Sequence, residues 1–501
     1  MNSKNIMKKG LASVLAIVMA MGMLTGCGST NDKKPVTESK QESQKTPSAS
    51  SEEPVTIKWF RSYAVETKDE QKIQDAINEY IEPLINVKVE IYNDQGTDIS
   101  LALAAGDDID LFHGNKNSAF ALLKDNAAMD ITDIIKDYDT LYNLIPESIW
   151  EAAKWSDGKN YHVPVYKEMT QGWGVTVATE AIEKFGWDLS EVDELSDLTP
   201  FLAEAYANGY DSPFCSSSLY WQHFAFPDHA RVEIAPFLVK LSEPDKIINW
   251  AETEEYKEYV ELVYEWNQAG YINQDELVSN NGDIKLAQKY QDGRSVFATW
   301  TNVPAGDSIA SSRYSTDVIC LDITGNRLTM GGAFGSNYMI NKNSEKVDAV
   351  MKFLTLLYTD RTVADLACFG IEGEHYTRDA EGKVELISGS GYRYNGVWCV
   401  TQIGAPSLMK GEPDDKVKVY NEHNAAAPVD LLAGFVPDTT AVAAELSAIS
   451  AVNSSYQMTL GRGFYEPSEY IAKFQADLKA AGVEKVQAEI QKQYDAWRAG
   501  K

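Results

Sequence analysis

The stretch Val55-Thr-Ile-Lys-Trp-Phe60 begins the part of the chain that can fold, and its β-branched and aromatic residues predict a strand. Apolar residues at helical spacing from Ile73 onward predict a helix, which Pro83 should end. Residues 87–91 alternate apolar and charged side chains, which predicts a second strand, and a third is predicted over 109–113 after another helix. This strand–helix–strand order is typical of an α/β layer with a mainly parallel sheet, whose ligands bind beyond the carboxyl ends of the strands.

The same alternation of elements continues to the end of the chain. Strands are predicted over 161–165, 173–178, 295–299 and 318–321, and an amphipathic helix over 347–358. The last part predicts a helical hairpin, whose first arm Pro467 opens and Gly482 closes. At 501 residues the chain is too long for one ordinary core, so two lobes are expected.

The N-terminus is typical of a secretory leader. Lysines at positions 4, 8 and 9 precede an apolar run from Leu11 to Leu24, which is short for a membrane-spanning helix. Thr25 and Gly26 before Cys27 resemble a bacterial lipobox, which implies a signal peptide over 1–26 and a lipid, such as palmitate, on Cys27. An ordinary cleaved signal is the alternative. Residues 27–54 are almost wholly polar and predict a disordered tether.

Charge and cysteine content exclude several classes of partner. The net charge of −29 argues against binding nucleic acid or lying flat on anionic lipid. No CxxC pair occurs, and the six histidines do not lie at metal-ligand spacing with the cysteines, so neither a metal nor another cofactor is expected. Cys215, Cys320, Cys368 and Cys399 could form disulfides outside the cytoplasm, or remain as buried thiols.

Several segments, in a shared order, resemble the extracellular solute-binding proteins of ABC importers. Asp157-Gly-Lys-Asn-Tyr-His-Val-Pro164 is similar to a DGK-Y-x-x-P segment of that family. Gln291-Asp-Gly-Arg-Ser-Val-Phe-Ala298 and the block from Gly331 to Asp360 match two more, although Tyr338 stands where the family often has Trp or Gly. The remaining similar segments, three of them typical of lipoproteins of carbohydrate uptake, are residues 173–186, 370–376, 434–435 and 474–497.

This resemblance implies a two-lobed, type II periplasmic-binding-protein-like α/β fold. The chain would cross between the lobes about three times, near residues 163–168, 332–338 and 432–437, with the ligand in the cleft between the lobes. The implied division is 55–165 for the first part of lobe 1, 166–332 for the first part of lobe 2, 333–432 for the rest of lobe 1, and 433–501 for a helical part that belongs mainly to lobe 2.

Candidate ligand-binding residues are aromatic and polar side chains at predicted strand ends, at crossings and in loops without a helical or strand pattern. Sugar rings stack their C–H faces on aromatic planes, and their hydroxyls need fixed polar partners. A sandwich is predicted in which Trp221 and Trp300 face Trp59, although Trp59 could equally be core and His113 a local hydrogen-bonding residue. The candidate residues are Trp59, Arg61, Tyr63, His113, Asn115, Lys167, Glu168, Trp173, Tyr220, Trp221, Gln222, Trp300, Asn337, Tyr338 and Trp398.

The predicted function is that of a receptor, held by its lipid on the outer face of the cell membrane. It would capture a solute and deliver it to an ABC transporter permease, and the resemblance implies that this solute is an oligosaccharide. The protein is expected to be a monomer and not an enzyme. One alternative is a glycan-active hydrolase, because 74 acidic residues place some carboxylate pairs close together by chance. The other is a structural or adhesive surface lipoprotein, which would explain the anchor but not the ordered segments.

Overall fold

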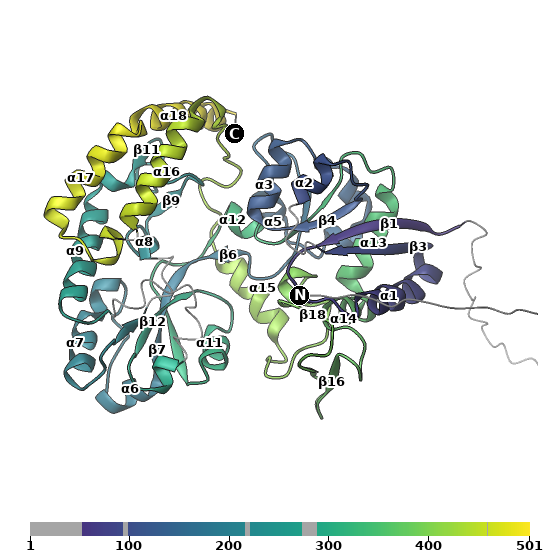
Figure 1. Ribbon diagram of the computed structural model, residues 1–501, viewed down its shortest axis with the longest axis horizontal. Helices are drawn as coiled ribbons and strands as arrows, with labels where there is room; N and C mark the ends of the chain where they lie inside the picture. The colour runs from purple at the N-terminus through teal and green to yellow at the C-terminus, as the bar shows by residue number, and fades with distance from the viewer. Residues whose placement is uncertain (1–52, 94–98, 216–220, 273–287, 458, 501) are drawn as a thin grey trace, which may run out of the picture. The chain divides into compact units, whose positions relative to one another are not determined.

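The computed structural model describes residues 53–93, 99–215, 221–272, 288–457 and 459–500. The predicted leader, Cys27, nearly all of the predicted tether, and Tyr220 lie outside the described residues. Two separate apolar cores organise the described part, the first built around one sheet and the second around two (Figure 1). None of the described helices is long and apolar enough to span a membrane.

The first core surrounds a five-stranded sheet with the order β3-β1-β4-β15-β5. The predicted parallel layer is present, since β1 pairs in parallel with both β3 and β4, while β15 runs antiparallel between β4 and β5. Helices α1 (Glu70–Ile85) and α13 (Val347–Thr359) pack on this layer (Figure 1). The strands are β1 (Val55–Arg61), β3 (Val87–Asn93), β4 (Leu111–Gly114), β15 (Asn337–Ile340) and β5 (His162–Pro164).

Helix α1 shows how the sequence pattern sets one element and where it fails. Ile73, Ile77 and Ile81 form the buried stripe that the apolar spacing predicts. The prediction that Pro83 ends the helix was wrong, because Pro83 lies within the last turn. The helix ends at Asn86, which adopts a left-handed conformation with φ of 55° and donates its backbone N–H to the Glu82 carbonyl.

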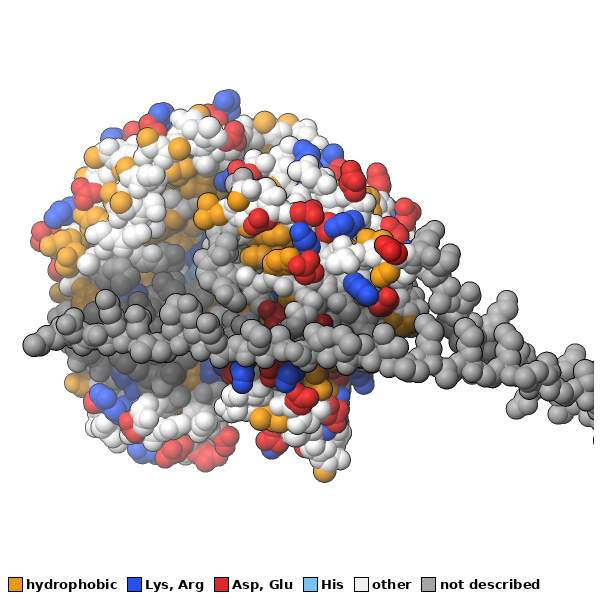
Figure 2. All heavy atoms as spheres, turned by 45° about the vertical axis from the view of Figure 1, so that its right-hand side comes forward, with side chains coloured by type: hydrophobic (Ala, Val, Ile, Leu, Met, Phe, Trp, Pro, Cys, Tyr) orange, Lys and Arg blue, Asp and Glu red, His pale blue; other side chains and the backbone are white. Residues whose placement is uncertain are grey.

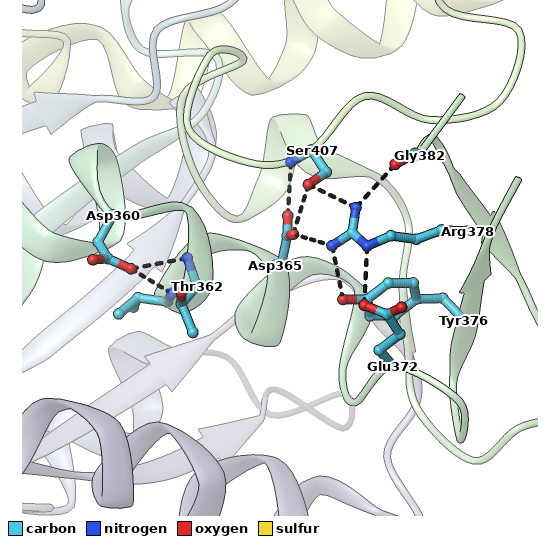
Figure 3. Close-up of polar contacts among 9 residues, drawn as sticks. Asp360, Thr362, Asp365, Glu372, Tyr376, Arg378, Gly382 and Ser407 are labelled. Carbon is cyan, nitrogen blue, oxygen red and sulfur yellow. Dashed lines mark hydrogen bonds and ion pairs between the residues drawn. The ribbon is translucent and has the colours of Figure 1, made fainter. Parts of the chain in front are cut away.

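Within the first lobe, a polar network holds together the segment that follows α13 (Figure 3). Asp360 caps α14 (Arg361–Phe369) by accepting hydrogen bonds from the Thr362 and Val363 backbone N–H groups at 2.8 and 3.1 Å. The buried Asp365 accepts from the Ser407 N–H and hydroxyl at 2.7 Å each and pairs with Arg378 at 2.9 Å. Arg378 belongs to β16 (Tyr376–Arg378), which pairs with β17 (Val384–Leu386).

The second core surrounds a four-stranded sheet and a three-stranded sheet. Strand β7 (Trp173–Ala178) lies between β13 (Val318–Asp322) and β12 (Phe297–Thr301) and is antiparallel to both, and β12 pairs with β8 (Phe214–Cys215). The three-stranded sheet consists of β11 (Ile247–Asn249), β10 (Phe237–Lys240) and β9 (His229–Arg231). The helices of this region include α6 (Thr179–Phe185), α7 (Thr199–Ala207), α9 (Glu254–Gln268) and α11 (Gly306–Tyr314).

The C-terminal helices complete the second core rather than the first. They are α16 (Ala443–Gln457), α17 (Pro467–Ala480) and α18 (Val483–Ala499), and the last two are the predicted hairpin with Pro467 at its first position (Figure 1). Ile449, Phe474 and Tyr494 from these helices are buried in the second core. The second core is therefore assembled from two stretches of sequence that are separated by a return to the first core.

Two small elements connect the cores. Strand β6 (Thr170–Gln171) pairs with β14 (Arg327–Leu328) where the chain passes between core segments. Helix α15 (Lys416–Ala426) lies against the same region, because its Asn424 side chain accepts a hydrogen bond from the Met169 N–H at 2.9 Å and donates to the Lys167 carbonyl at 2.7 Å. Acidic and basic side chains are interspersed on the face shown in Figure 2.

Candidate functional site

A cavity of about 330 Å³ lies where segments of both cores meet. Met330 belongs to the first core, whereas Phe226, Leu432 and Phe435 belong to the second. Polar and charged side chains make up much of the remaining wall, which is typical of a ligand site. The polar, aromatic and charged lining residues are Lys116, Gln171, Trp173, His223, His229, Arg231, Glu233, Thr324, Arg327, Thr329 and Asp430.

Trp173, the first residue of β7, forms an aromatic wall of this cavity. Its ring stacks on the His223 ring with the centroids 3.6 Å apart and an interplanar angle of 10°. The Arg231 guanidinium lies 5.7 Å from the Trp173 ring centroid, and its Nη1 donates a hydrogen bond to His223 Nε2 at 3.2 Å. Burial and the nearby Arg231 and Lys116 charges lower the pKa of His223, so this imidazole is neutral at pH 7.

Fixed polar groups stand beside this ring. The Gln171 amide oxygen accepts a hydrogen bond from the Thr329 hydroxyl at 2.7 Å. Lys116, at the start of α3 (Lys116–Lys124), pairs with Glu233 at 2.6 Å and so ties the first lobe to the loop after β9. Burial raises the pKa of Asp430 to about 6, although its carboxylate accepts the Leu432 N–H at 2.8 Å and Arg327 lies nearby.

The first-lobe candidates lie together at the carboxyl ends of β1 and β4, but most of them are core. Trp59, Arg61, His113, Asn337 and Tyr338 are all at most 1 % exposed. These five side chains therefore present no surface to a ligand in this structure, which corrects the expectation that they would face the cleft. The reason is that β1 and β4 are interior strands, covered on the Trp59 side by Phe353 of α13 at 4.9 Å between rings.

Most polar atoms of these buried residues are hydrogen-bonded within the protein, the exceptions among them being Trp59 Nε1 and His113 Nδ1. Arg61 donates to the Tyr392 hydroxyl at 2.8 Å and to the Ala367 carbonyl at 2.7 Å. His113 Nε2 lies 2.8 Å from the Ser336 hydroxyl, and burial lowers the pKa of His113 to about 3. The Tyr338 hydroxyl donates to the Val400 carbonyl at 2.7 Å, and the Asn337 amide to the Phe334 carbonyl at 2.9 Å.

Three other first-lobe candidates are half-exposed and touch one another. The Asn115 amide donates to the Tyr63 hydroxyl at 2.7 Å, and the Tyr63 and Trp398 rings lie 5.1 Å apart. Tyr63 has a φ of 68°, which is uncommon for a residue with a side chain and often marks a functional position. Asn115 also caps α3, so one side chain serves both the helix and this cluster.

The second-lobe candidates are divided in the same way. Trp300 is 6 % exposed and packs against Tyr314 with ring centroids 5.8 Å apart, so it belongs to the second core. Lys167 and Glu168 form an ion pair with each other. Trp221 and Gln222 lie in the short helix α8 (Trp221–Phe224), but their side chains are outside the described residues. Among the described candidates, Trp173 is the one that lines the cavity.

Several cavity residues escaped prediction from the sequence. Arg231, Arg327 and Asp430 lie far apart along the chain and belong to no motif, so no local pattern could have pointed to them. Within the described ranges, no group of three His, Cys, Asp or Glu side chains could hold a metal ion. The four cysteines in those ranges are free thiols, and three of them are buried.

Comparisons with known proteins agree with this architecture. A family model described as "Domain of unknown function (DUF3502)" matches residues 431–499, the helical part that completes the second core and supplies Leu432 and Phe435 to the cavity. A carbohydrate ABC transporter substrate-binding protein of Streptococcus pneumoniae serotype 4 (strain ATCC BAA-334 / TIGR4) is 24% identical over 518 residues, which cover 99% of this chain and 100% of that protein.

Solved structures extend the likeness to three dimensions. The N-glycan transport solute binding protein (NgtS) from Streptococcus pneumoniae superimposes with a TM-score of 0.75 and 22% identity, covering 88% of this chain and 99% of that one. An HMO binding ABC-transporter associated solute binding protein from Bifidobacterium longum infantis ATCC 15697 superimposes with a TM-score of 0.58 and 14% identity. The match covers 89% of this chain and 99% of that one. This chain therefore has the two-lobed fold of solute-binding proteins and resembles a carbohydrate substrate-binding protein of an ABC transporter along its whole length.

Proposed function

We propose that this protein is an extracytoplasmic receptor that binds an oligosaccharide in the cavity around Trp173 and delivers it to an ABC transporter permease. The observation that carries the proposal is the wall formed by Trp173 beside Gln171, Arg231 and Asp430, at the junction of the two cores. An aromatic plane suits the C–H face of a sugar ring, and the flanking polar groups suit its hydroxyls. The likeness to NgtS, whose structures include complexes with Man1GlcNAc and Man5GlcNAc, supports a sugar ligand.

We further infer that the ligand extends toward the half-exposed cluster of Tyr63, Asn115 and Trp398, and the role of Trp221 in binding stays a prediction from the sequence. Two lobes that close by a hinge motion would bring such groups against one ligand. Binding rather than catalysis fits the cavity, because Glu233 is held by Lys116 and the Asp430 carboxylate by a backbone N–H. The similar proteins are likewise binding proteins by name, one a carbohydrate ABC transporter substrate-binding protein and the other an N-glycan transport solute binding protein.

We also propose that lipid on Cys27 holds the protein on the outer face of the membrane as a monomer. The support is the basic, apolar leader and the small residues before Cys27, with the polar stretch 28–54 as a spacer. A single acyl chain anchors only marginally, so stable attachment needs more than one.

A thermal-shift screen of the purified chain across oligosaccharides tests the receptor function. A true ligand at about 100 times its dissociation constant adds roughly 2.7 kcal/mol to the free energy of unfolding, which gives a clear rise in melting temperature. The constituent monosaccharides serve as matched controls and should give smaller shifts, because they fill only part of the cavity. After prolonged incubation, chromatography should return the ligand intact. Absence of a shift with every oligosaccharide, or turnover to shorter sugars, would contradict the proposal.

A further inference from the structure

The charges around the cavity are unusual for so acidic a protein. Lys116, Arg231 and Arg327 supply positive charge to its wall, while Glu233 and Asp430 are the acidic residues there. The whole chain carries a formal net charge of −29, so an excess of cationic side chains at one site does not follow from composition. Lys116 and Glu233 pair with each other and cancel, which leaves the two arginines against Asp430.

Arg231 lacks a carboxylate partner. Its guanidinium hydrogen-bonds to the neutral His223, and in the described part of the chain no carboxylate lies within ion-pair distance of it. Burial among protein atoms lowers the pKa of Arg231 to about 10, so the group remains charged at pH 7 although it is desolvated. A buried charge is normally paired, because removing it from water is costly.

Arg327 lies on β14 and also faces this cavity without a partner. Among the described residues, its guanidinium forms neither an ion pair nor a hydrogen bond. Asp430 is near enough for Arg327 to lower its pKa, but not near enough to pair with it. His229, which is buried in the same wall, has no hydrogen-bond partner on either ring nitrogen. The cavity therefore contains several hydrogen-bond donors, on Arg231, Arg327 and His229, that could bind an acceptor on a ligand.

A second cavity, of about 520 Å³ in the first lobe, provides a contrast. Arg378 and Lys383 in its wall are both already paired, Arg378 with Asp365 at 2.9 Å and Lys383 with Asp414 at 2.9 Å (Figure 3). The third cationic side chain of that wall, Arg361, is exposed and forms no ion pair or hydrogen bond with the described residues, whereas Arg231 and Arg327 are half-buried. Half-buried guanidinium groups without a carboxylate partner are therefore found in the Trp173 cavity and not in this second one.

We propose that the oligosaccharide bound in the Trp173 cavity is anionic, and that Arg231 and Arg327 hold its negatively charged group. This inference rests on the proposed receptor function and specifies the class of sugar. A guanidinium matches the planar oxygens of a carboxylate, and also those of a sulfate, by paired hydrogen bonds. A hydroxyl of a neutral sugar can accept a hydrogen bond from either arginine but cannot neutralise its charge. The local cations also offset the repulsion that a strongly acidic protein exerts on an anion.

The test is calorimetric titration with matched pairs of ligands. One arm uses oligosaccharides that contain hexuronate, each beside its methyl ester, which keeps the rings and removes the charge. The other arm uses sulfated oligosaccharides beside their desulfated forms, so the two arms identify the source of the charge. We expect at least one charged member to bind about tenfold or more tighter than its neutral partner, and this preference to shrink as salt increases.

The variant Arg327→Gln should reduce that charged-to-neutral affinity ratio toward one. Arg393→Gln is the matched control, because Arg393 lies on β18 (Arg393–Tyr394), pairs with Glu66 and is outside the cavity, so the ratio should stay as in the wild type. If neutral oligosaccharides bind and every charged partner binds equally or more weakly, the inference fails while the receptor function stands. If no glycan of either kind binds, both fail together. A wild-type ratio in Arg327→Gln would overturn the role of Arg327.

Discussion

At the scale of single residues, Trp173 and Trp59 show why an aromatic side chain at a predicted strand end is an ambiguous signal. Both were candidates, but Trp173 is the first residue of β7, whereas Trp59 lies inside β1. Trp173 is half-exposed and lines the cavity, whereas Trp59 is 0 % exposed and packs against Phe353 and Tyr338. Replacing the two residues should therefore affect different properties of the protein.

Trp173→Ala should weaken sugar binding by on the order of thirtyfold, about 2 kcal/mol, because the stacking face and its packing are lost. Trp59→Ala should instead cost about 3–5 kcal/mol of folding stability, since it leaves a void in the first core. Calorimetric titration and urea unfolding of both variants separate the two effects. Binding by Trp173→Ala at wild-type affinity would show that this ring is not part of the ligand site.

Asp430 makes folding stability depend on pH in a direction opposite to most carboxylates. Its folded pKa of about 6 lies above the ordinary aspartate pKa of 3.8, so the folded state binds more protons between these values. Stability from this group is therefore lost as pH rises from about 4 to 6, and the loss reaches on the order of 3 kcal/mol at pH 7.

Asp430→Asn keeps an oxygen for the Leu432 N–H and removes the charge. The variant should be more stable than the wild type at pH 7 by up to that amount, and the difference should vanish near pH 4. Urea unfolding at both pH values measures it. Asp438→Asn is the control with the opposite sign, because hydrogen bonds from Thr440 lower the pKa of the exposed Asp438. Equal stability of Asp430→Asn and the wild type at pH 7 would refute the assignment.

At the scale of elements, the docking of the C-terminal helical region on α9 depends on one close backbone approach. Gly463 follows the turn of 3-10 helix at Leu460–Arg462, has a φ of 73°, and would place a Cβ 2.7 Å from the Val263 carbonyl carbon and 2.9 Å from Tyr264 Cα. These are backbone atoms of α9 and cannot rotate away. Gly411 has a similar φ of 88°, with no atom within 4 Å of an added Cβ.

Gly463→Ala should therefore destabilise the protein more than Gly411→Ala, by about 1–3 kcal/mol, because both variants bear the left-handed strain and only the first also overpacks. Parallel urea unfolding curves of the two variants give the difference directly. If both variants lose the same free energy of unfolding, the backbone at the contact between this turn and α9 can shift to accommodate the added Cβ at little cost.

The order of elements could largely be predicted from the sequence. In each strand of the first sheet, and in each helix that packs on it, the apolar residues are spaced at the repeat of that element. The antiparallel placement of β15 between β4 and β5 was not readable, since Asn337–Ile340 joins a sheet whose other strands lie far earlier in the chain. Strand pairing over such separations is set by packing rather than by local preference.

At the scale of the whole molecule, the chain builds two cores, each from two separate stretches of sequence. The first draws on Ile57–Met169 and Leu328–Val400, the second on Val175–Ile323 and Leu432–Tyr494. The lobe boundaries implied by the family resemblance stay a prediction. The interleaving places residues 430–435 beside residues 171–173 at the cavity, so the C-terminal region takes part in the site as well as in the second core.

The attachment of the whole molecule to a membrane should depend on one atom, the sulfur of Cys27. Mass spectrometry of the wild-type N-terminal peptide should show Cys27 as the first residue and lipid-modified. Cys27→Ala should be released from the cell or left unprocessed, while keeping the wild-type melting temperature once purified. An unmodified Cys27, or cleavage at another position, would contradict the lipobox resemblance.

The sequence by itself determined the α/β class, most helices and strands, and the resemblance to solute-binding proteins, because periodicity, turn residues and short motifs are local properties. It also placed Trp173 and the cluster of Tyr63, Asn115 and Trp398 among the candidates. Only the tertiary structure decided that Trp59, Arg61, His113, Trp300, Asn337 and Tyr338 are buried, and that Arg231, Arg327 and Asp430 share one cavity. Burial and charge proximity depend on which distant segments pack together, and no local pattern in the chain records that.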